Sequence, residues 1–533
     1  MAKSTQRVDA VIIGAGFAGM YMLYRLRQLG LSVRVFEAGG DVGGTWYWNR
    51  YPGARCDIES MEYSYQFSDE LQQEWDWTER YATQPEILAY ANHVADRYQL
   101  RPDIEFNCRV ASAVFDEASG RWDLATEHGD ELNAQFCIFA TGCLSVPLKP
   151  HFEGLESFSG DVYYTGRWPH EPVDFSGKRV AVVGTGSSGI QSIPVIAGQA
   201  QQLTVFQRSP TYTVPAHNTP LEPAARDRIK ANYDDFRTRN KEMGGCFGAR
   251  HISSNGHAME ASTAERQQQL EVSWQQGGLM FLAAFGDLMH DLEANEVARE
   301  FVRNKIREQV NDPAVADLLC PDSTIGCKRL CVDSGYYQTY NRDNVALVDI
   351  SSYPIEAVTA TGIRCADSER EFDVIVFATG FDAMTGALNR VDIRGRDDLS
   401  LQDKWQHGPR TYLGLETVGF PNLFMITGPG SPSVLSNMLQ SIEQHVNWIA
   451  DFIAWLQQQG LSLAEPEQEA EDQWMELVAE QVAPTVFNSC NSWYVGANVE
   501  GKARIFMPFI DVPTYVSACE EIVAQGYPGF VFA

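Results

Sequence analysis

The segment Val8 to Gly19, VDAVIIGAGFAG, decides the fold of this chain. Its apolar run, Val8 to Ile13, predicts a buried parallel strand, and a G-x-G-x-x-G turn follows that strand directly. The residues after the turn continue with apolar side chains at helical spacing: Met20, Leu23, Leu26 and Leu29. A strand, a glycine-rich turn and a helix in this order predict a dinucleotide-binding unit.

Each glycine of this turn has a physical task. Gly14 permits the tight turn, Gly16 lets the backbone approach a pyrophosphate, and Gly19 lets the helix pack on the strand. The next strand, 32–37, ends in Glu37, whose carboxylate is placed to accept hydrogen bonds from ribose hydroxyls. A glycine-rich turn without a ligand is the alternative. The first nucleotide site should therefore include Gly14, Gly16, Phe17, Ala18, Gly19 and Glu37.

A second segment, Arg179 to Gly189, repeats the pattern as RVAVVGTGSSG. The strand that follows ends in Arg208, at the position that corresponds to Glu37 in the first unit. An arginine there pairs with a 2′-phosphate, whereas a carboxylate accepts ribose hydroxyls. We therefore expect FAD in the first unit and NADP in the second, with a surface cation as the alternative for Arg208. The glycines of the second turn are Gly184, Gly186 and Gly189.

The composition limits the partners. The 533 residues carry a formal net charge of −29, which argues against nucleic acid or an anionic membrane surface as a general partner. The sequence contains no apolar run of eighteen residues and no secretory signal, so we expect a cytoplasmic protein without a membrane span. The 11 cysteines include no C-x-x-C pair. Reduced, mostly buried thiols are expected, without a metal site or a dithiol redox centre.

The segment 39–57, GGDVGGTWYWNRYPGARCD, is predicted to be a long loop because glycine, proline and aromatic residues dominate it. Its aromatic side chains Trp46, Trp48 and Tyr51 could wall an isoalloxazine ring. Asp57 ends the loop close to Arg55, and an exposed loop acid is the alternative for Asp57. Loops of this length in compact domains are usually functional.

Two further regions have helical patterns. Residues 221–312 are polar and helix-rich, with one apolar stripe at Phe281, Phe285, Leu288 and Leu292 and another at Val302, Ile306 and Val310. This region is predicted to be a helical insertion that covers a substrate site, with plain packing as the alternative. A long helix follows the strand and loop 421–433, with Ser433 as its N-cap and an apolar seam from Leu435 to Leu456.

Between the two glycine motifs lies the segment Phe158 to Pro169, which by its residue types predicts only a loop or linker. This segment resembles the F-x-G-x-x-x-H-x-x-x-W-P fingerprint of type I Baeyer–Villiger monooxygenases. The two glycine motifs and the segment from Gly43 to Asp57 match that family too, and the resemblance covers the whole chain. It is closest to the members that oxidise phenylacetone. The fingerprint positions are Phe158, Gly160, Tyr164, Trp168 and Pro169, with Tyr164 in place of the family's histidine.

The resemblance implies a reaction in which NADPH reduces FAD and dioxygen adds to the flavin C4a position. The peroxyflavin then attacks a ketone, and the product is an ester or a lactone. Sulfide oxidation is compatible with this interpretation. An N- or S-oxygenating flavin monooxygenase is the nearest alternative, although its fingerprint lacks the Trp168-Pro169 ending. A flavin disulfide reductase is disfavoured because no C-x-x-C exists, and a nucleotide-binding protein without turnover is the alternative from another class. The fingerprint histidine is thought to serve domain linkage and coupling, so Tyr164 bears on coupling efficiency.

The resemblance also assigns residues. Arg329 matches the active-site arginine, and Asp57 matches the acid that positions it. Further FAD contacts would come from Gly44, Thr45, Trp46, Tyr63, Val110 and Met438. NADP contacts would come from Thr185, Ser187, Ser188, Gln191, Arg208, Lys328, Arg329 and Trp493, besides the second set of glycines. The substrate pocket would include Ser433, Val434, Leu435 and Met438.

We predict an α/β fold with two doubly wound, Rossmann-like dinucleotide-binding domains and a helical insertion. The FAD domain is expected to be discontinuous, with residues 1–143 and 381–533. The NADP domain would comprise 144–220 and 325–380, and the insertion 221–324. The expected partners are a small ketone and dioxygen. We expect a monomer, although the sequence does not determine the oligomeric state.

Overall fold

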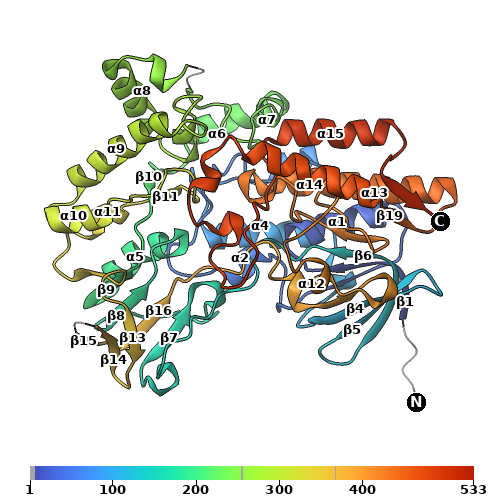
Figure 1. Cartoon of the computed structure of the whole chain (residues 1–533), viewed down its shortest axis with the longest axis horizontal. Coiled ribbons are helices and arrows are strands. Elements are labelled where there is room, and N and C mark those ends of the chain that lie inside the picture. The colour runs from blue at the N-terminus through green and yellow to red at the C-terminus, as the bar shows by residue number, and fades with distance from the viewer. Residues whose placement is uncertain (1–5, 254–255, 367) are drawn as a thin grey trace.

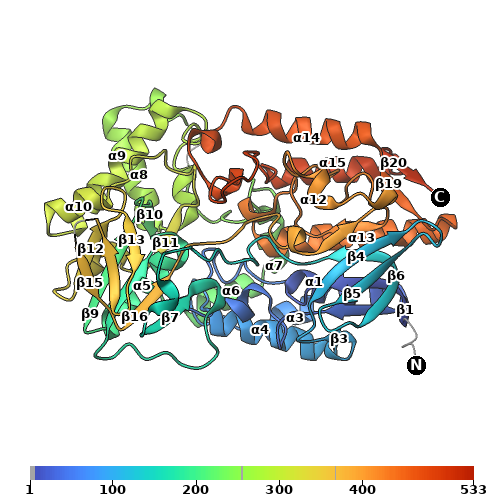
Figure 2. The ribbon, with the colours of Figure 1, turned by 60° about the horizontal axis from the view of Figure 1, so that its bottom comes forward.

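The computed structural model describes residues 6–253, 256–366 and 368–533. Two sheets that contain parallel strands form the centres of its two halves (Figures 1 and 2). The larger sheet has eight strands in the order β17-β4-β5-β6-β1-β2-β3, with β18 paired to β6. These strands are β1 (Gln6–Ile13), β2 (Val33–Phe36), β3 (Ile104–Glu105), β4 (Val110–Asp116), β5 (Arg121–Thr126), β6 (Glu131–Phe139), β17 (Asp392–Arg394) and β18 (Leu423–Met425).

The predicted first unit is confirmed: β1 leads through the glycine turn into helix α1 (Phe17–Gln28). Strand β1 pairs in parallel with β2 on one side and β6 on the other. Helix α13 (Met438–Gln459) packs against α1, and the Tyr21 hydroxyl donates to Asn447 Oδ1 over 2.8 Å. The two helices thereby bury one face of the sheet over its centre.

The start of α13 corrects one expectation. Its N-cap is Asn437, whereas Ser433 and Leu435 lie in a short 3-10 helix, Ser433–Leu435, before it. Ser433 is therefore not the N-cap of the long helix, because a second turn intervenes. The predicted apolar seam is buried from Leu439 to Leu456, which places α13 in the core.

The second sheet has five parallel strands in the order β12-β9-β8-β16-β7. Its glycine turn leads from β8 into helix α5 (Ser187–Gln199), as predicted. The strands are β7 (Asp161–Tyr164), β8 (Arg179–Val183), β9 (Gln202–Gln207), β12 (Val345–Asp349) and β16 (Val374–Phe377). Strand β7 lies in the segment predicted to be only a loop or linker. That expectation was wrong because β7 pairs with β16 at the edge of the sheet, where Tyr164 stacks on Phe377.

The helical region lies above the second sheet, with α8 and α9 at the upper left of Figure 1. Its helices are α6 (Pro223–Lys230), α7 (Tyr233–Lys241), α8 (Thr263–Gln276), α9 (Leu292–Gln309) and α10 (Pro313–Leu319). Val302 and Ile306 are buried on α9, and Val310 is buried just after it, as predicted. The other predicted stripe is not one helix. It is divided between a 3-10 helix, Leu279–Ala283, several turns and the start of α9, and Leu292 is exposed.

The remaining elements complete both halves. The loop 39–57 contains a four-residue helix, α2 (Thr45–Trp48), so it is not entirely irregular as predicted. The other helices are α3 (Asp69–Glu74), α4 (Gln84–Arg97), α11 (Tyr336–Thr339), α12 (Leu401–Lys404), α14 (Gln468–Val482) and α15 (Val512–Ala524). The other strands are β10 (Thr213–Pro215), β11 (Cys331–Asp333), β13 (Ile355–Val358), β14 (Gly362–Cys365), β15 (Glu369–Glu371), β19 (Ala464–Pro466) and β20 (Phe530–Phe532).

The cysteines correct another expectation. Cys327 and Cys490 form a disulfide, so these two are not reduced thiols. They are separated by 163 residues, and no local spacing motif reveals the pair. Over the described parts of the chain, no helix is long and apolar enough to cross a membrane. The residue bounds of the three predicted domains stay predictions.

Candidate active site

The two glycine turns have nearly the same backbone geometry. Gly14 has φ +108°, and a Cβ there would lie 2.6 Å from the Ala140 carbonyl oxygen. Gly184 has φ +110°, and its Cβ would lie 2.5 Å from the Ala378 carbonyl oxygen. Each turn therefore passes closely over the end of a neighbouring parallel strand. A Cβ on Gly186 would meet nothing within 4 Å, which leaves the backbone at the start of α5 open to a pyrophosphate.

A cavity of about 650 Å³ lies between the two glycine turns and the loop 39–57. Seventeen of the predicted site residues line it: Gly14, Gly16, Phe17, Ala18, Glu37, Gly44, Thr45, Trp46, Asp57, Tyr63, Val110, Ser187, Gln191, Arg329, Val434, Met438 and Trp493. Trp48 and Tyr51, also expected to wall a flavin, line it as well. The structure thus brings together residues from both glycine motifs, the aromatic loop and the C-terminal segments.

Other predicted residues lie outside this lining. They are Gly19, Gly184, Thr185, Gly186, Ser188, Gly189, Arg208, Lys328, Ser433, Leu435 and the five fingerprint positions. Ser433 is fully buried, and Thr185 donates from Oγ1 to the Ser209 carbonyl oxygen over 3.0 Å. Gly19 packs its Cα against the Gly14 carbonyl, which supports the turn instead of contacting a ligand.

Glu37 is buried at the end of β2, beside the first glycine turn. Its Oε2 accepts from the Ala15 amide over 2.7 Å, and its Oε1 accepts from the Gly39 amide over 2.6 Å. Burial raises the pKa of Glu37, and these two backbone hydrogen bonds oppose that rise. The two amides hold the carboxylate at the cavity wall, where ribose hydroxyls would be recognised.

Arg329 and Asp57 form a two-point ion pair across the cavity. Arg329 Nε donates to Asp57 Oδ2 over 2.9 Å, and Nη2 donates to Oδ1 over 2.8 Å. Arg329 Nη1 also donates to the Val434 carbonyl oxygen over 2.8 Å. Burial acts to lower the pKa of Arg329, but the facing Asp57 carboxylate outweighs it and the pKa is raised. The guanidinium is therefore a permanent cation with a fixed orientation.

Sequence reasoning missed two partners of this site. The Tyr494 side chain is buried and hydrogen-bonds Arg329, and burial raises the pKa of Tyr494 to about 12. Arg167 lines the cavity and lies 4.3 Å from the Trp48 ring centroid, so it joins the fingerprint segment to the aromatic loop. Tyr494 follows the predicted Trp493, and Arg167 precedes Trp168 of the fingerprint. Their position next to predicted site residues is the one sequence feature that could have identified them.

Arg208 and Lys328 form the positive part of the second site. Burial lowers the pKa of Lys328, and the Arg208 charge lowers it further, which shows that the two cations are near each other. In the described ranges no carboxylate forms an ion pair with either side chain. Two neighbouring cations without an acid fit an anionic ligand group such as a 2′-phosphate.

Gln191 links the two halves instead of only facing a nucleotide. Its Oε1 accepts from the Tyr51 hydroxyl over 2.9 Å, and its Nε2 donates to the Arg55 carbonyl oxygen over 3.2 Å. Helix α5 is therefore attached to the aromatic loop next to Asp57.

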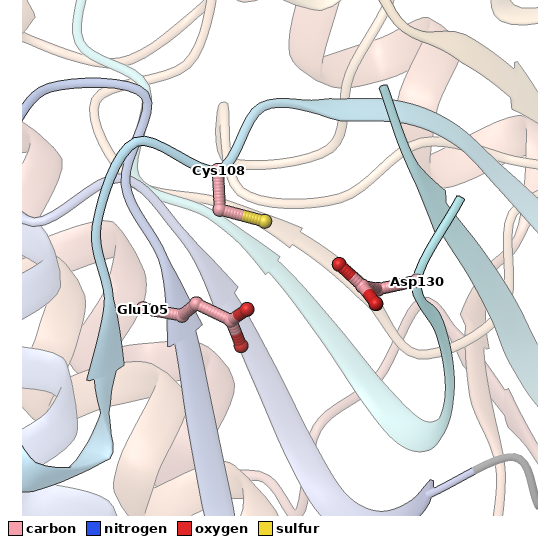
Figure 3. A group of neighbouring side chains, drawn as sticks. All are labelled: Glu105, Cys108 and Asp130. Atoms are coloured by element: carbon pink, nitrogen blue, oxygen red, sulfur yellow. The ribbon is translucent and has the colours of Figure 1, made fainter. Parts of the chain in front are cut away.

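Figure 3 shows a group beside the first unit, Glu105, Cys108 and Asp130, of which Cys108 also lines the cavity. One ligand atom from each lies within 4.8 Å of the others. Burial, and then the Glu105 charge, raise the pKa of Cys108, which opposes the thiolate form that metals bind. The chemistry of this group therefore does not favour a metal ion.

Comparison with known proteins agrees with this geometry. The family described as pyridine nucleotide-disulphide oxidoreductase matches residues 11–272, which include both glycine turns. A Baeyer–Villiger monooxygenase from Pseudooceanicola batsensis is 42% identical over 98% of this chain and 96% of its own length. The chain belongs to the Baeyer–Villiger monooxygenases. It is accordingly an NADPH-dependent flavoprotein monooxygenase with FAD as its cofactor.

Solved structures support the same fold for this Baeyer–Villiger monooxygenase. An oxidized steroid monooxygenase bound to NADP has a TM-score of 0.95 and 52% identity, with 99% of each chain covered. A structure titled OTEMO complex with FAD and NADP has a TM-score of 0.95 and 39% identity, with 100% of each chain covered. The predicted fold of two Rossmann-like domains with a helical insertion is confirmed. The particular likeness to the phenylacetone-oxidising members stays a prediction.

Proposed function

We propose that Arg329, held by Asp57, is the group that directs the chemistry of this monooxygenase toward a ketone carbonyl. The observation that carries this proposal is the two-point ion pair at 2.8 and 2.9 Å on the wall of the cavity. A fixed cation stabilises negative charge that develops on oxygen during attack on a carbonyl. Asp57 is then a positioning residue that acts through Arg329.

The residues of this chain fit both cofactors. The Gly14 turn and Glu37 suit a dinucleotide whose ribose is unphosphorylated, as in FAD. The Gly184 turn, Arg208 and Lys328 suit NADP, because no carboxylate among the described residues forms an ion pair with either cation. FAD held by these residues would supply the activation of dioxygen, with NADPH as the source of electrons. Trp493 lines the shared cavity, and we assign it to the nicotinamide side.

The substrate side is mainly apolar. Val434 and Met438 line the cavity, and both belong to a cluster with other apolar side chains: Leu144, Met384, Leu435 and Phe506. Such a wall favours a ketone with a large apolar body, and one similar structure is named as a steroid monooxygenase. Ser433 is buried, so we assign it to shaping the wall, not to contact with the ketone. The product is an ester, or a lactone when the ketone is cyclic.

The proposal also covers the oligomeric state, the cellular location and the partners of the protein. The net charge of −29 supports a protein that works without nucleic acid or an anionic membrane surface. We propose a monomer in the cytoplasm, with a small ketone and dioxygen as its partners.

Arg329→Ala tests the proposal. The purified variant should still bind FAD and oxidise NADPH, but it should form no ester from ketones that the wild type converts. The panel should contain phenylacetone, cyclohexanone, a steroid ketone, an alkyl sulfide and a tertiary amine, with products identified by mass. Normal ester yield from the variant would refute the assignment. Oxygenation of only the amine and sulfide by the wild type would favour the alternative, an N- or S-oxygenating monooxygenase.

A further inference from the structure

The disulfide Cys327–Cys490 joins two segments that both reach the cavity. Cys327 immediately precedes Lys328 and Arg329, and Cys490 lies three residues before Trp493. The two Cα atoms are 6.1 Å apart. The covalent bond therefore connects the arginine segment to the segment that carries Trp493 and Tyr494.

We call residues 484–507 the Trp493 loop. The ends and the middle of this loop are anchored on the site. Phe487, Tyr494, Phe506 and Met507 are buried in one apolar cluster, and the Met507 carbonyl oxygen accepts from the Gly430 amide over 2.6 Å. The Val486 amide donates to the Met289 carbonyl oxygen over 2.9 Å, and Asn498 Nδ2 donates to the Phe381 carbonyl oxygen over 2.7 Å. Lys502 Nζ pairs with Asp382 over 2.7 Å. Between Phe487 and Trp493, residues 488–492 make no long-range hydrogen bond to the described parts of the chain, so the disulfide at Cys490 is what ties this stretch to the arginine segment.

The two cysteine residues differ in exposure. Cys327 is fully buried, whereas Cys490 is partly exposed and lies beside exposed Asn488, Ser489 and Asn491. An external thiolate can therefore reach the sulfur of Cys490 and not that of Cys327.

We propose that Cys327–Cys490 is a thiol-exchange site that clamps the Trp493 loop over the NADP side of the cavity. A dithiol opens it: one thiolate attacks Cys490 Sγ, the S–S bond breaks, and Cys327 leaves as a thiolate and takes up a proton. The second thiol of the reductant then displaces the Cys490 thiol, so two electrons pass to the protein and the reductant becomes a disulfide. The proposal rests on the proposed function and on the cytoplasmic setting, where protein disulfides are usually transient or redox-sensing.

Opening the clamp leaves Arg329 paired with Asp57, so flavin binding and NADPH oxidation should persist. What changes is the retention of NADP⁺ by the Trp493 loop. We expect reduction to speed the release of NADP⁺ about tenfold, within the range of couplings between sites in proteins. The fraction of NADPH that yields hydrogen peroxide instead of ester should rise with it.

The test uses the holoenzyme. Protein unfolded in denaturant and alkylated without reductant should give a linked peptide containing Cys327 and Cys490 and nine labelled cysteines, and dithiothreitol should release two more thiols. Limited proteolysis in the presence of NADP⁺ should cut 484–507 faster after reduction. The variant Cys490→Ser should reproduce the reduced state without reductant. The control Cys320→Ser removes a partly exposed free thiol and should keep the wild-type response to reductant.

Eleven labelled cysteines in unreduced protein would overturn the proposal. So would an intact disulfide whose reduction changes neither proteolysis of 484–507 nor the release of NADP⁺. If Cys490→Ser fails to fold, reduction of the wild type decides the question alone. Proteolysis and NADP⁺ release require no ketone, so a failure of ketone oxygenation with both responses intact would refute only the proposed function.

Discussion

Replacing Asp57 with asparagine tests how far the active site depends on the orientation of Arg329. The wild-type carboxylate accepts from two guanidinium nitrogens at 2.8 and 2.9 Å, and the two side chains are only 27% and 20% exposed. Asparagine keeps one oxygen acceptor but loses the charge and the second acceptor. Arg329 still keeps its bond to the Val434 carbonyl and its contact with Tyr494.

The size of the effect follows from these contacts. Loss of one preorganised group that stabilises an oxyanion lowers kcat by about 10² to 10³. Because Asp57→Asn loosens Arg329 without removing it, we expect a fall in ester formation of about 10²-fold, or about 2.7 kcal/mol in the activation free energy. The KM for NADPH should change less than about threefold, since Arg208 and Lys328 are untouched. Asp57→Glu, which restores the charge, should recover part of the rate.

The assay measures ester formation and NADPH consumption under saturating ketone, with the flavin spectrum as a check on cofactor content. The matched control is Asp373→Asn, which disturbs another arginine–carboxylate pair, Arg179–Asp373 at 2.9 Å, away from the cavity. The control should retain the wild-type rate of ester formation. An Asp57→Asn rate within threefold of the wild type would show that Arg329 does not need Asp57, and the reasoning would fail.

Three further predictions follow from other parts of the structure. Arg208→Ala should raise the KM for NADPH about 10- to 100-fold, because one charge-assisted contact to the 2′-phosphate is lost. The KM for NADH, which lacks that phosphate, should stay within about twofold of the wild-type value. Equal changes in both KM values would contradict the prediction. Gly14→Ala should yield protein without FAD, because the new Cβ would lie 2.6 Å from the Ala140 carbonyl oxygen; a flavin absorbance ratio equal to that of the wild type would rule this out. Burial raises the pKa of Glu443 from 4.5 to about 7 in the folded protein, so the folded state binds this proton more tightly than the unfolded chain does. The resulting contribution to the free energy of unfolding is complete below about pH 4.5 and is lost as the pH rises through about 7. Glu443→Gln keeps an oxygen acceptor for the Gln66 and Phe67 amides but carries no charge at any pH. In denaturant titrations, the unfolding free energy of this variant should exceed that of the wild type by about 2 to 3 kcal/mol at pH 8 and by little at pH 5. A difference that does not change with pH would refute the prediction.

The sequence predicted the parts of the fold that depend on local pattern. Val8 to Ile13 and Arg179 to Val183 are strands because their apolar runs are continuous, and the glycine turns after them need positive φ that other residues avoid. Two of the wrong expectations, the linker that forms β7 and the reduced state of all cysteines, depend on tertiary contacts. Strand β7 forms because Tyr164 can stack on Phe377, which is more than two hundred residues away in the chain.

The candidate active site also contains residues that could be assigned from the sequence and residues that could not. Arg329 and Asp57 were assigned through the family resemblance, and the structure brings them together across 272 positions of sequence. The partners Tyr494 and Arg167 were missed because a single tyrosine or arginine beside a tryptophan has no pattern of its own. The disulfide was missed for a similar reason, since Cys327 and Cys490 are 163 residues apart in the chain and no spacing motif joins them.

The most direct test of the central claim is isotope incorporation by the wild-type holoenzyme. Purified protein is given NADPH, a steroid ketone or cyclohexanone, and ¹⁸O-labelled dioxygen, and the product is examined by mass spectrometry. We predict an ester or lactone that carries one ¹⁸O atom, formed in proportion to the NADPH consumed, and no such product from Arg329→Ala. NADPH oxidation that yields only hydrogen peroxide across the whole ketone panel, or an ester without label, would contradict the account.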